Sequence, residues 1–465
     1  MTGGPIRHSA LFCLHALLVV GCSERGVPGG SSSPEGYSSL DSINESNVAP
    51  LSVAWVYDAG ATFMATPVVA DGVVYADADG LGVHAISAGT GRQLWYFEAK
   101  VPVPSDQPEG SEGHGVGRWS RGVAHWRDRV YVTARDGRLF ALDAATGAPV
   151  WERETCVVRS DAARGSISGA PHVVDGRIVV ATAGTRDTKG HLTAFDAATG
   201  KTIWTFTEPV EPPGAAAEHD TTDWGAMTYD PGLRLLYVSS IGEQPSILGI
   251  HPGTGRVQWQ YRLEKPQAQR GAAGGHLVLA ELEIDGARRR VIMQARPNGQ
   301  LHVLDRTDGT QISSARYTES RSASFEYPPV FSPKVKLLHL PIEEDGMQYL
   351  QAWNPVTAKE EWRIVLEQST PCAGLLSTAG NLLLQGDAEG YRNVYESEWG
   401  EVRERAVIDA CSTASPFSYS VGGVQYIGVS VPGRILALRL GGGETNESRT
   451  MKRYPRTVRP PGESS

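Results

Sequence analysis

The chain has 465 residues, and 40% of them are hydrophobic, so it can bury a sizeable core and is not disordered as a whole. Its 43 Lys and Arg against 52 Asp and Glu give a net charge of −9, which excludes a global basic field that attracts nucleic acid. No apolar run reaches the roughly 20 residues of a membrane-spanning helix. The 53 Gly among 465 residues exceed the usual share of about 7%, and this excess is typical of short strands joined by tight turns.

The first predicted element is an export signal. Arg7 precedes an apolar run over 10–20 that is too short to span a membrane, as in secretory signals. The run ends in Val-Val-Gly-Cys22, which resembles a bacterial lipoprotein box whose cysteine is acylated. We therefore expect 1–22 to be a lipoprotein-type signal peptide and the mature chain to be a periplasmic lipoprotein anchored to the outer membrane through Cys22. The alternative is an ordinary signal peptide with an incidental cysteine. Residues 23–36, rich in Gly, Ser and Pro, are predicted to be a flexible tether.

A repeated motif dominates the rest of the chain. Complete or nearly complete copies of the pattern Asp-x-x-Thr-Gly-x-x-x-Trp end at Trp95, Trp151, Trp204, Trp259 and Trp362, and degenerate copies end near Ile312 and Val402. Successive copies are 40 to 56 residues apart, which indicates the blades of a propeller. In each copy two alternating strands precede a turn, and we expect the Trp to start an outer strand and to dock against the neighbouring blade.

The two ends of the repeat region complement each other. Trp55 belongs to a strand that precedes any complete blade, whereas the strands predicted over 423–429 and 434–439 lack an outer strand. The simplest closure lets the N-terminal strand complete the last blade, which leaves no sheet edge exposed. The sequence therefore predicts an all-β fold, an eight-bladed β-propeller over 37–440 closed by the N-terminal strand, followed by a disordered tail over 441–465.

Several longer strings occur in a fixed order along the chain. They are YSSLDSINESNVAPLSVAW (37–55), RGVAHWRDRVYVTARDGRLFALDAATG (121–147), GSISGAPHVVDGRIVVATAG (165–184), MTYDPGLRLLYV (227–238), LAELEIDGARRRVIMQARPNGQLHVLDR (279–306) and LLSTAGNLLLQGDAEG (375–390). With the blade motif, this ordered set resembles the pyrroloquinoline quinone (PQQ)-dependent alcohol dehydrogenases, eight-bladed quinoproteins of the periplasm. A shared fold does not by itself establish shared chemistry.

The resemblance implies PQQ and Ca²⁺ in a central funnel, with an Asp beside the cofactor as catalytic base. In this chain the family's Glu and Asn ligands of Ca²⁺ fall on Thr185 and Gly242, and its catalytic Asp falls on Arg270. No Asp or Glu occurs from Lys265 through Ala280. Since Ca²⁺ needs several oxygen ligands, these changes argue against the metal and against alcohol oxidation.

Other residues offer partial substitutes. His276 is a candidate base, although a lone His in an apolar strand is more often a surface or hydrogen-bonded residue. Asp187 and Glu243 lie two and one residues from the lost ligand positions and are weak candidates for a cation site. The family's vicinal cysteine pair falls on Gly115 and Val116. Its Pro-Lys-Asn-Gly string is replaced by Arg-Pro-Asn-Gly over 296–299.

Part of the funnel matches the family. Arg121 matches a cofactor-binding Arg, Ser168 stands where relatives place a hydroxyl against the quinone, and Trp224 matches the Trp on which the quinone ring stacks. An aromatic face and a guanidinium suit a planar polyanion such as PQQ. The alternatives are an ion pair within a blade for Arg121, a turn cap for Ser168 and ordinary core for Trp224.

Three cysteines remain after the predicted signal, namely Cys156, Cys372 and Cys411. An exported chain can form disulfides, and an odd count leaves at least one thiol unpaired. Cys372 and Cys411 belong to consecutive blades, so a bridge between them is a hypothesis that leaves Cys156 free. The chain has no haem-attachment Cys-x-x-Cys-His, so an active enzyme would pass its electrons to a separate carrier.

Three functions follow from these observations. The favoured hypothesis is a lipid-anchored quinoprotein-like propeller that binds an anionic or quinone-like small molecule and has lost Ca²⁺-assisted oxidation. The second is an active PQQ-dependent alcohol or sugar dehydrogenase with a rearranged site. The third is a protein-binding scaffold similar to the eight-bladed lipoprotein of outer-membrane protein assembly.

Overall fold

A computed structural model describes residues 36–49, 51–78, 82–100, 122–134, 136–155, 167, 169–184, 190–207, 223–241, 245–264, 276–320, 323, 327–366, 373–408 and 410–441. These residues form strands, turns and bends, and none of them lies in a helix. Accordingly, the described part of the chain has no helix that is long and apolar enough to cross a membrane.

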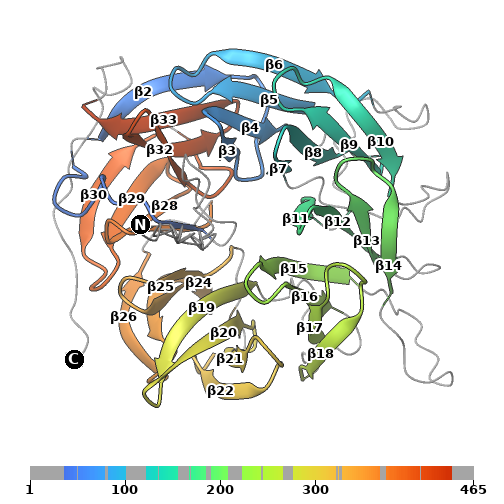
Figure 1. Ribbon diagram of the computed structural model, residues 1–465. Coiled ribbons are helices and arrows are strands. Elements are labelled where there is room, and N and C mark those ends of the chain that lie inside the picture. Colours follow the sequence, from blue (N-terminus) through green and yellow to red (C-terminus); the bar gives the residue numbers. More distant parts are fainter. Residues whose placement is uncertain are drawn as a thin grey trace, which may run out of the picture.

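The strands form eight sheets that follow one another around a central axis, as Figure 1 shows. We number these blades 1 to 8 in chain order. Blades 1 to 4 contain Val68–Ala70 (β3), Val73–Asp77 (β4), Gly82–Ser87 (β5), Gln93–Glu98 (β6); Val123–Trp126 (β7), Arg129–Thr133 (β8), Arg138–Asp143 (β9), Pro149–Glu154 (β10); His172–Val174 (β11), Arg177–Thr182 (β12), His191–Asp196 (β13), Thr202–Phe206 (β14); and Asp223–Asp230 (β15), Leu235–Ile241 (β16), Ser246–Ile250 (β17), Val257–Arg262 (β18).

Blades 5 to 8 repeat this plan. They contain Leu277–Ile284 (β19), Ala287–Ala295 (β20), Gln300–Asp305 (β21), Gln311–Arg316 (β22); Val330–Ser332 (β23), Leu337–Glu344 (β24), Met347–Asn354 (β25), Lys359–Val365 (β26); Leu376–Thr378 (β27), Leu382–Gly386 (β28), Tyr391–Glu396 (β29), Val402–Val407 (β30); and Phe417–Val421 (β31), Val424–Val431 (β32), Arg434–Leu440 (β33) with Leu51–Asp58 (β2). The predicted all-β eight-bladed propeller is therefore confirmed.

The N-terminal strand closes the ring as predicted. β2 pairs antiparallel with β33, so that Trp55 lies opposite Ala437 and Leu51 opposite Leu440. The pairing leaves the last blade with four strands that come from both ends of the repeat region. A two-residue strand, Tyr37–Ser38 (β1), adds a feature that the sequence did not predict: it pairs in parallel with the first strand of blade 7. β1 also lies against β23 and β31, so it packs among the inner strands of blades 6 to 8.

The motif tryptophans dock as expected. The indole of Trp95 in blade 1 covers Gly147 in the turn of blade 2, where an added Cβ would lie 2.5 Å from the indole Cε3. Its Nε1 donates a hydrogen bond of 3.0 Å to the carbonyl of Ala144 in the same turn. The same contact recurs between a Trp and the turn glycine of the next blade, in the pairs Trp55–Gly91, Trp151–Gly200, Trp204–Gly255, Trp259–Gly309 and Trp362–Gly400.

The turn that receives each indole is held by its own side chains. In blade 2 the Oδ1 of Asp143 accepts hydrogen bonds from the backbone N–H of Thr146 at 2.9 Å and from its hydroxyl at 2.7 Å. Gly147 then adopts a φ of 74°, a conformation that glycine tolerates best. The sequence Asp-x-x-Thr-Gly thus builds a tight turn with a flat site for the neighbouring indole.

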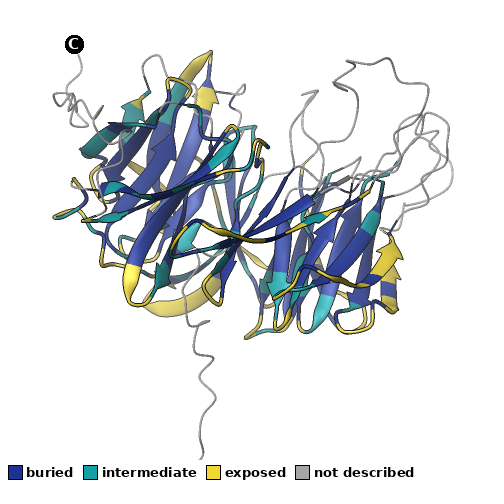
Figure 2. Cartoon of the chain, turned by 90° about the horizontal axis from the view of Figure 1, so that it is seen from above, coloured by how far each residue is buried: buried dark blue, intermediate teal, exposed yellow. Residues whose placement is uncertain are grey.

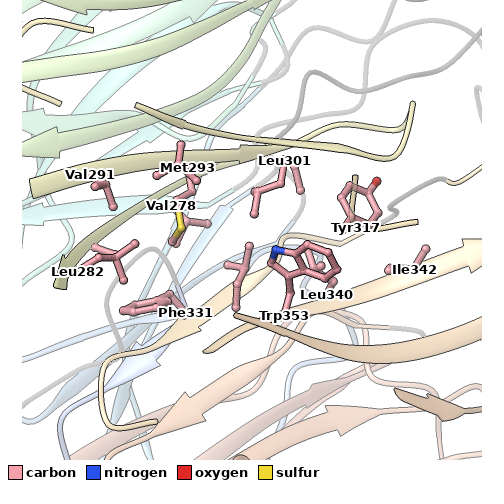
Figure 3. Packing of buried hydrophobic residues seen from close by; sticks show 14 of the residues in the cluster. Val278, Leu282, Val291, Met293, Leu301, Tyr317, Phe331, Leu340, Ile342 and Trp353 are labelled. Atoms are coloured by element: carbon pink, nitrogen blue, oxygen red, sulfur yellow. The ribbon is translucent and has the colours of Figure 1, made fainter. Parts of the chain in front are cut away.

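The hydrophobic core lies between neighbouring blades. Figure 3 shows one such layer, in which Val278, Val291 and Met293 of blade 5 face Phe331 and Trp353 of blade 6. Similar clusters join the other blades, and Figure 2 shows buried strands throughout the ring with exposed residues at turns and outer edges. Burial of apolar surface at about 25 cal/mol per Å² makes these layers the main source of stability.

Candidate functional site

The two ends of the blades have different roles. The first strand of each blade begins, and the second ends, at one face, which we call the funnel face. The Asp-x-x-Thr-Gly turns lie at the opposite end of the third strands, which we call the turn face. Each link between blades enters the next first strand at the funnel face, and second and third strands are also joined there. The predicted site residues therefore belong to loops at the funnel face or to the strand ends beside them.

Most of the predicted site residues lie outside the described residues. These are the cofactor candidates Arg121 and Ser168, the cation candidates Asp187 and Glu243, the residue at the family's base position, Arg270, and the cysteines Cys22 and Cys372. Trp224, His276 and Cys411 are described, and the first two lie at the funnel-face ends of inner strands.

Trp224 lies near the start of β15 and is 2% exposed. Its indole belongs to a core cluster between blades 3 and 4, and its ring centroid is 6.0 Å from that of Phe206 at an interplanar angle of 53°. A β-bulge separates Trp224 from Met227 in the pairing with β16. In this structure the indole therefore packs as a core residue, and a planar ligand can stack on it only after the groups that cover it move.

His276 and Cys411 lie at the entrances to two inner strands. His276 directly precedes β19 and is partly buried. Cys411 precedes β31 and is disulfide-bonded. Because Cys411 is the one cysteine in the described part of the chain, its partner lies outside that part, and the pairing with Cys372 stays a prediction.

The buried charges at the funnel face include Arg296 and Asp387, which were not predicted as site residues. Arg296 directly follows β20 and is 7% exposed, and burial lowers the pKa of its guanidinium while Glu264 raises it. Its Nη1 donates a 2.8 Å hydrogen bond to the carbonyl of Glu264, at the end of blade 4. Asp387 directly follows β28 and is 2% exposed; its Oδ2 accepts hydrogen bonds from Asn393 at 2.9 Å and Arg405 at 3.4 Å.

The described residues do not form a metal site by themselves. Within the ranges given above, no group of three or more His, Cys, Asp or Glu side chains is placed to hold an ion. PQQ, a planar tricarboxylate, would need an accessible aromatic face and accessible cations. Here Trp224 is 2% exposed and Arg296 is 7% exposed, so each would have to be uncovered before it could contact such a ligand.

Comparison with known proteins identifies relatives with the same propeller fold. The family model of the PQQ glucose/ethanol/alcohol dehydrogenase β-propeller domain matches residues 27–321. The quinohemoprotein alcohol dehydrogenase ADH IIB of Pseudomonas putida is 30% identical over 88% of this chain and 73% of its own length. The crystal structure of the quinohemoprotein alcohol dehydrogenase of Comamonas testosteroni superimposes with a TM-score of 0.74 at 26% identity, covering 91% of this chain and 81% of that chain. BamB from Moraxella catarrhalis shares the fold alone, at 16% identity and a TM-score of 0.54 over 84% of this chain and 99% of that one.

Proposed function

This chain belongs to the PQQ glucose/ethanol/alcohol dehydrogenase β-propeller family, and we propose that it is a member that binds an anionic or quinone-like small molecule without Ca²⁺-assisted alcohol oxidation. The propeller supplies the family's framework. The difference that we propose lies in the links at the funnel face. By sequence resemblance, the family's positions for the metal ligands and the catalytic base fall on these links.

One observation carries the proposal, the absence of any carboxylate from Lys265 through Ala280. This stretch connects blades 4 and 5, between β18, which ends at Arg262, and β19, which begins at Leu277. The assignment of Arg270 rests on the sequence resemblance alone, by counting eleven residues back from Glu281 in the string LAELEIDG. An enzyme without a positioned base loses roughly 10²–10⁴ in rate, before any metal contribution is counted.

The same replacement supports an anionic ligand. A guanidinium at position 270, in the link between blades 4 and 5, with Arg121 in the link between blades 1 and 2, makes the funnel more cationic than a site built from Asp and other oxygen ligands. Buried cations are stable only when an anion meets them. A tricarboxylate quinone, when bound, would supply that charge and a reducible ring, and Trp224 would contact the ring after it is uncovered.

The relatives support a second candidate, an active dehydrogenase with a rearranged site. The proteins that are 30% identical to this chain carry names of alcohol dehydrogenases. His276 is then the candidate base, Asp187 and Glu243 the candidate cation ligands, and a separate electron carrier the acceptor. The scaffold alternative has the fold as its only support.

A titration separates these functions. We would add PQQ to the purified mature protein, with and without Ca²⁺, and follow both quinone absorbance and dye reduction by short alcohols and sugars. The proposal expects saturable binding with no turnover above the rate of free PQQ. Turnover that requires Ca²⁺ would establish the second candidate instead, and absence of binding of PQQ and of simpler tricarboxylates would leave the scaffold.

Charge reversal gives a sharper test within the same protein. If the funnel is inherited, Arg270→Asp should weaken PQQ binding at least about tenfold and raise Ca²⁺ affinity, because it restores a carboxylate beside the site. Arg289→Asp, on an exposed position of β20 in blade 5, is the matched control. Equal effects of the two variants would show that Arg270 does not face the ligand.

We also propose that the chain is exported and anchored in the periplasm through an acylated Cys22, as its N-terminal sequence predicts. Mass spectrometry of the membrane-extracted protein should find a lipidated N-terminus at Cys22. Cys22→Ser should release the protein into the soluble periplasmic fraction. A mature protein that is soluble without this substitution would contradict the anchor.

A further inference from the structure

The turn between β29 and β30 in blade 7 departs from the repeat. Its sequence, Glu-Ser-Glu-Trp-Gly, puts Trp399 where the complete copies carry Thr, and this side chain is 65% exposed. That is the largest exposed fraction among the large hydrophobic side chains of the described residues. Trp is the residue type most enriched at the energetic centres of interfaces, so an indole presented on a rigid turn is a candidate contact.

Carboxylates belong to the turn that carries this indole and to the segment bonded to it. The amide Nδ2 of Asn381 donates to Glu45, at 2.6 Å, and to Glu396, and the Oε2 of Glu396 accepts the backbone N–H of Trp399 at 2.9 Å. Glu398 is exposed beside Trp399. Within the described residues, Glu45, Glu396 and Glu398 have no ion pair with a cation.

The amide that joins the two carboxylates is itself incompletely satisfied. Asn381 is 4% exposed, and its buried Oδ1 has no hydrogen-bond partner among the described residues. A buried polar atom without a partner is destabilising, so a donor that approached this cluster would be favoured. The turn face of blade 7 therefore combines an exposed aromatic ring, an excess of negative charge and an unused acceptor.

The chain itself carries a segment of complementary chemistry. Residues 449–459, RTMKRYPRTVR, contain five Lys or Arg with Met, Tyr and Val between them. The described chain ends at Gly441, directly after β33, and the third strands of blades 7 and 8 both end at the turn face. Blade 8 is the neighbour of blade 7, as Figure 1 and their shared core cluster show. The eight residues from Gly441 to Arg449 can span about 27 Å when extended.

We propose that the basic segment 449–459 docks intramolecularly on the turn face of blade 7, with a cationic side chain over Trp399 and others against Glu45 and Glu398. A guanidinium or ammonium over an indole face adds a cation–π contact, and the carboxylates add charge attraction that salt screens. The proposal is independent of the funnel and of the function proposed above.

Zero-length carbodiimide cross-linking of the full-length chain tests this placement. Lys452 is the one lysine of the segment, and we expect mass spectrometry to find it joined chiefly to Glu45 or Glu398. Mixing of isotope-labelled and unlabelled protein separates links within one chain from links between chains. Salt at about 1 M, which shortens the Debye length to about 3 Å, should reduce the yield severalfold.

Two variants with a matched control complete the test. Trp399→Ala should lower the yield of both links about threefold, and Glu398→Gln should lower the yield of the Lys452–Glu45 link about threefold, whereas Val356→Ala should lower neither. Val356 is 43% exposed in the equivalent turn of blade 6 and so controls for loss of any apolar side chain on this face. The proposal is overturned if the Trp399 and Glu398 variants match the control, if Lys452 links are spread over the surface, or if the links join separate chains.

Discussion

Two kinds of junction between blades coexist in this propeller. At six junctions the indole of one blade covers the turn glycine of the next. At the junctions from blade 5 to blade 6 and from blade 7 to blade 8 the corresponding outer-strand positions are Ser313 and Glu404. The cross-strand partner and the receiving turn also differ at these two junctions. The indole therefore varies together with the residues that surround it.

The cross-strand partner of each residue changes with it. The docked tryptophans lie opposite Ala85, Ala141, Ala194, Gly249, Ala352 and Ala437. Ser313 and Glu404 instead lie opposite Val303 and Val394. A small partner leaves room for the indole, and an added Cβ at Gly249 would lie 2.4 Å from Trp259. Where the indole is missing, a larger partner fills the space.

The receiving turn changes as well. Blade 6, which follows Ser313, carries Ala358 in place of the turn glycine, at a φ of 55°. Blade 8 has no such turn, because its outer strand β2 comes from the other end of the repeat region. There Glu404 turns to its own blade and pairs with Arg392 at 2.7 Å, with side chains 8% and 1% exposed. The docked Trp is therefore found only where the next blade supplies a turn glycine to receive it.

The largest effect in this comparison is expected from removal of a docked indole. Trp151 is 8% exposed and donates a 3.1 Å hydrogen bond to the carbonyl of Ala197. Trp151→Ala should lower the free energy of unfolding by about 3–5 kcal/mol, because a large cavity opens between blades 2 and 3. Ser313→Ala, at the equivalent position of blade 5, should change it by less than about 0.5 kcal/mol. Urea denaturation of both variants measures the contrast, and similar midpoints would refute it.

The ion pair that stands at the last junction should be almost as important. Glu404→Gln leaves the Arg392 guanidinium, 1% exposed, without its carboxylate, and should cost about 3 kcal/mol. Glu401→Gln is the control, since Glu401 pairs with Arg403 at 3.4 Å and is 43% exposed. That exposed pair should contribute less than about 1 kcal/mol. A loss no larger than that of the control would mean that Arg392 is stabilised by the blade without its partner.

These junctions explain which parts of the molecule were predictable. The spacing of Trp and Thr-Gly predicts eight blades and the closure through Trp55, because each junction demands the same residues at the same places. The pairing of β1 with β27 was missed, since two residues carry no periodic signal. The links that contain Arg121, Ser168 and Arg270 follow no repeat. Their residues can be matched to family positions by resemblance, but the sequence does not predict how their side chains are arranged. Arg296 was noticed as a changed string, and its burial became evident only from the packing of blades 4 and 5.

The turn glycines offer a smaller and more specific test. Gly147→Ala would place a Cβ 2.5 Å from the indole of Trp95, at a φ of 74°, and should cost more than about 2 kcal/mol through overlap and backbone strain. Ala358→Gly removes a side chain from a left-handed position that no indole covers, so relief of strain and loss of chain stiffness offset each other within about 1 kcal/mol. Thermal unfolding of the two variants should show a loss for the first and almost none for the second. A comparable loss at Ala358 would show that the receiving turn needs its residue for another reason.

The smallest effect on stability at neutral pH is expected from a Tyr–His hydrogen bond between blades, which we call the clamp and which occurs at two of the indole junctions. Its effect on stability grows as the pH falls. Tyr57 of blade 8 bonds the Nδ1 of His84 in blade 1 at 2.8 Å, and Tyr261 approaches His302 in the same way between blades 4 and 5.

Burial lowers the pKa of His84 from 6.5 to about 4, so the folded state resists protonation that the unfolded state accepts. The stabilisation is complete above pH 6.5 and is lost as the pH falls from 6.5 toward 4. His84→Gln should therefore leave the midpoint of thermal unfolding nearly unchanged at pH 7 and flatten its decline between pH 6.5 and 4. If the His84 variant declines as steeply as the original, the acid sensitivity belongs to other buried groups and the clamp does not contribute to it.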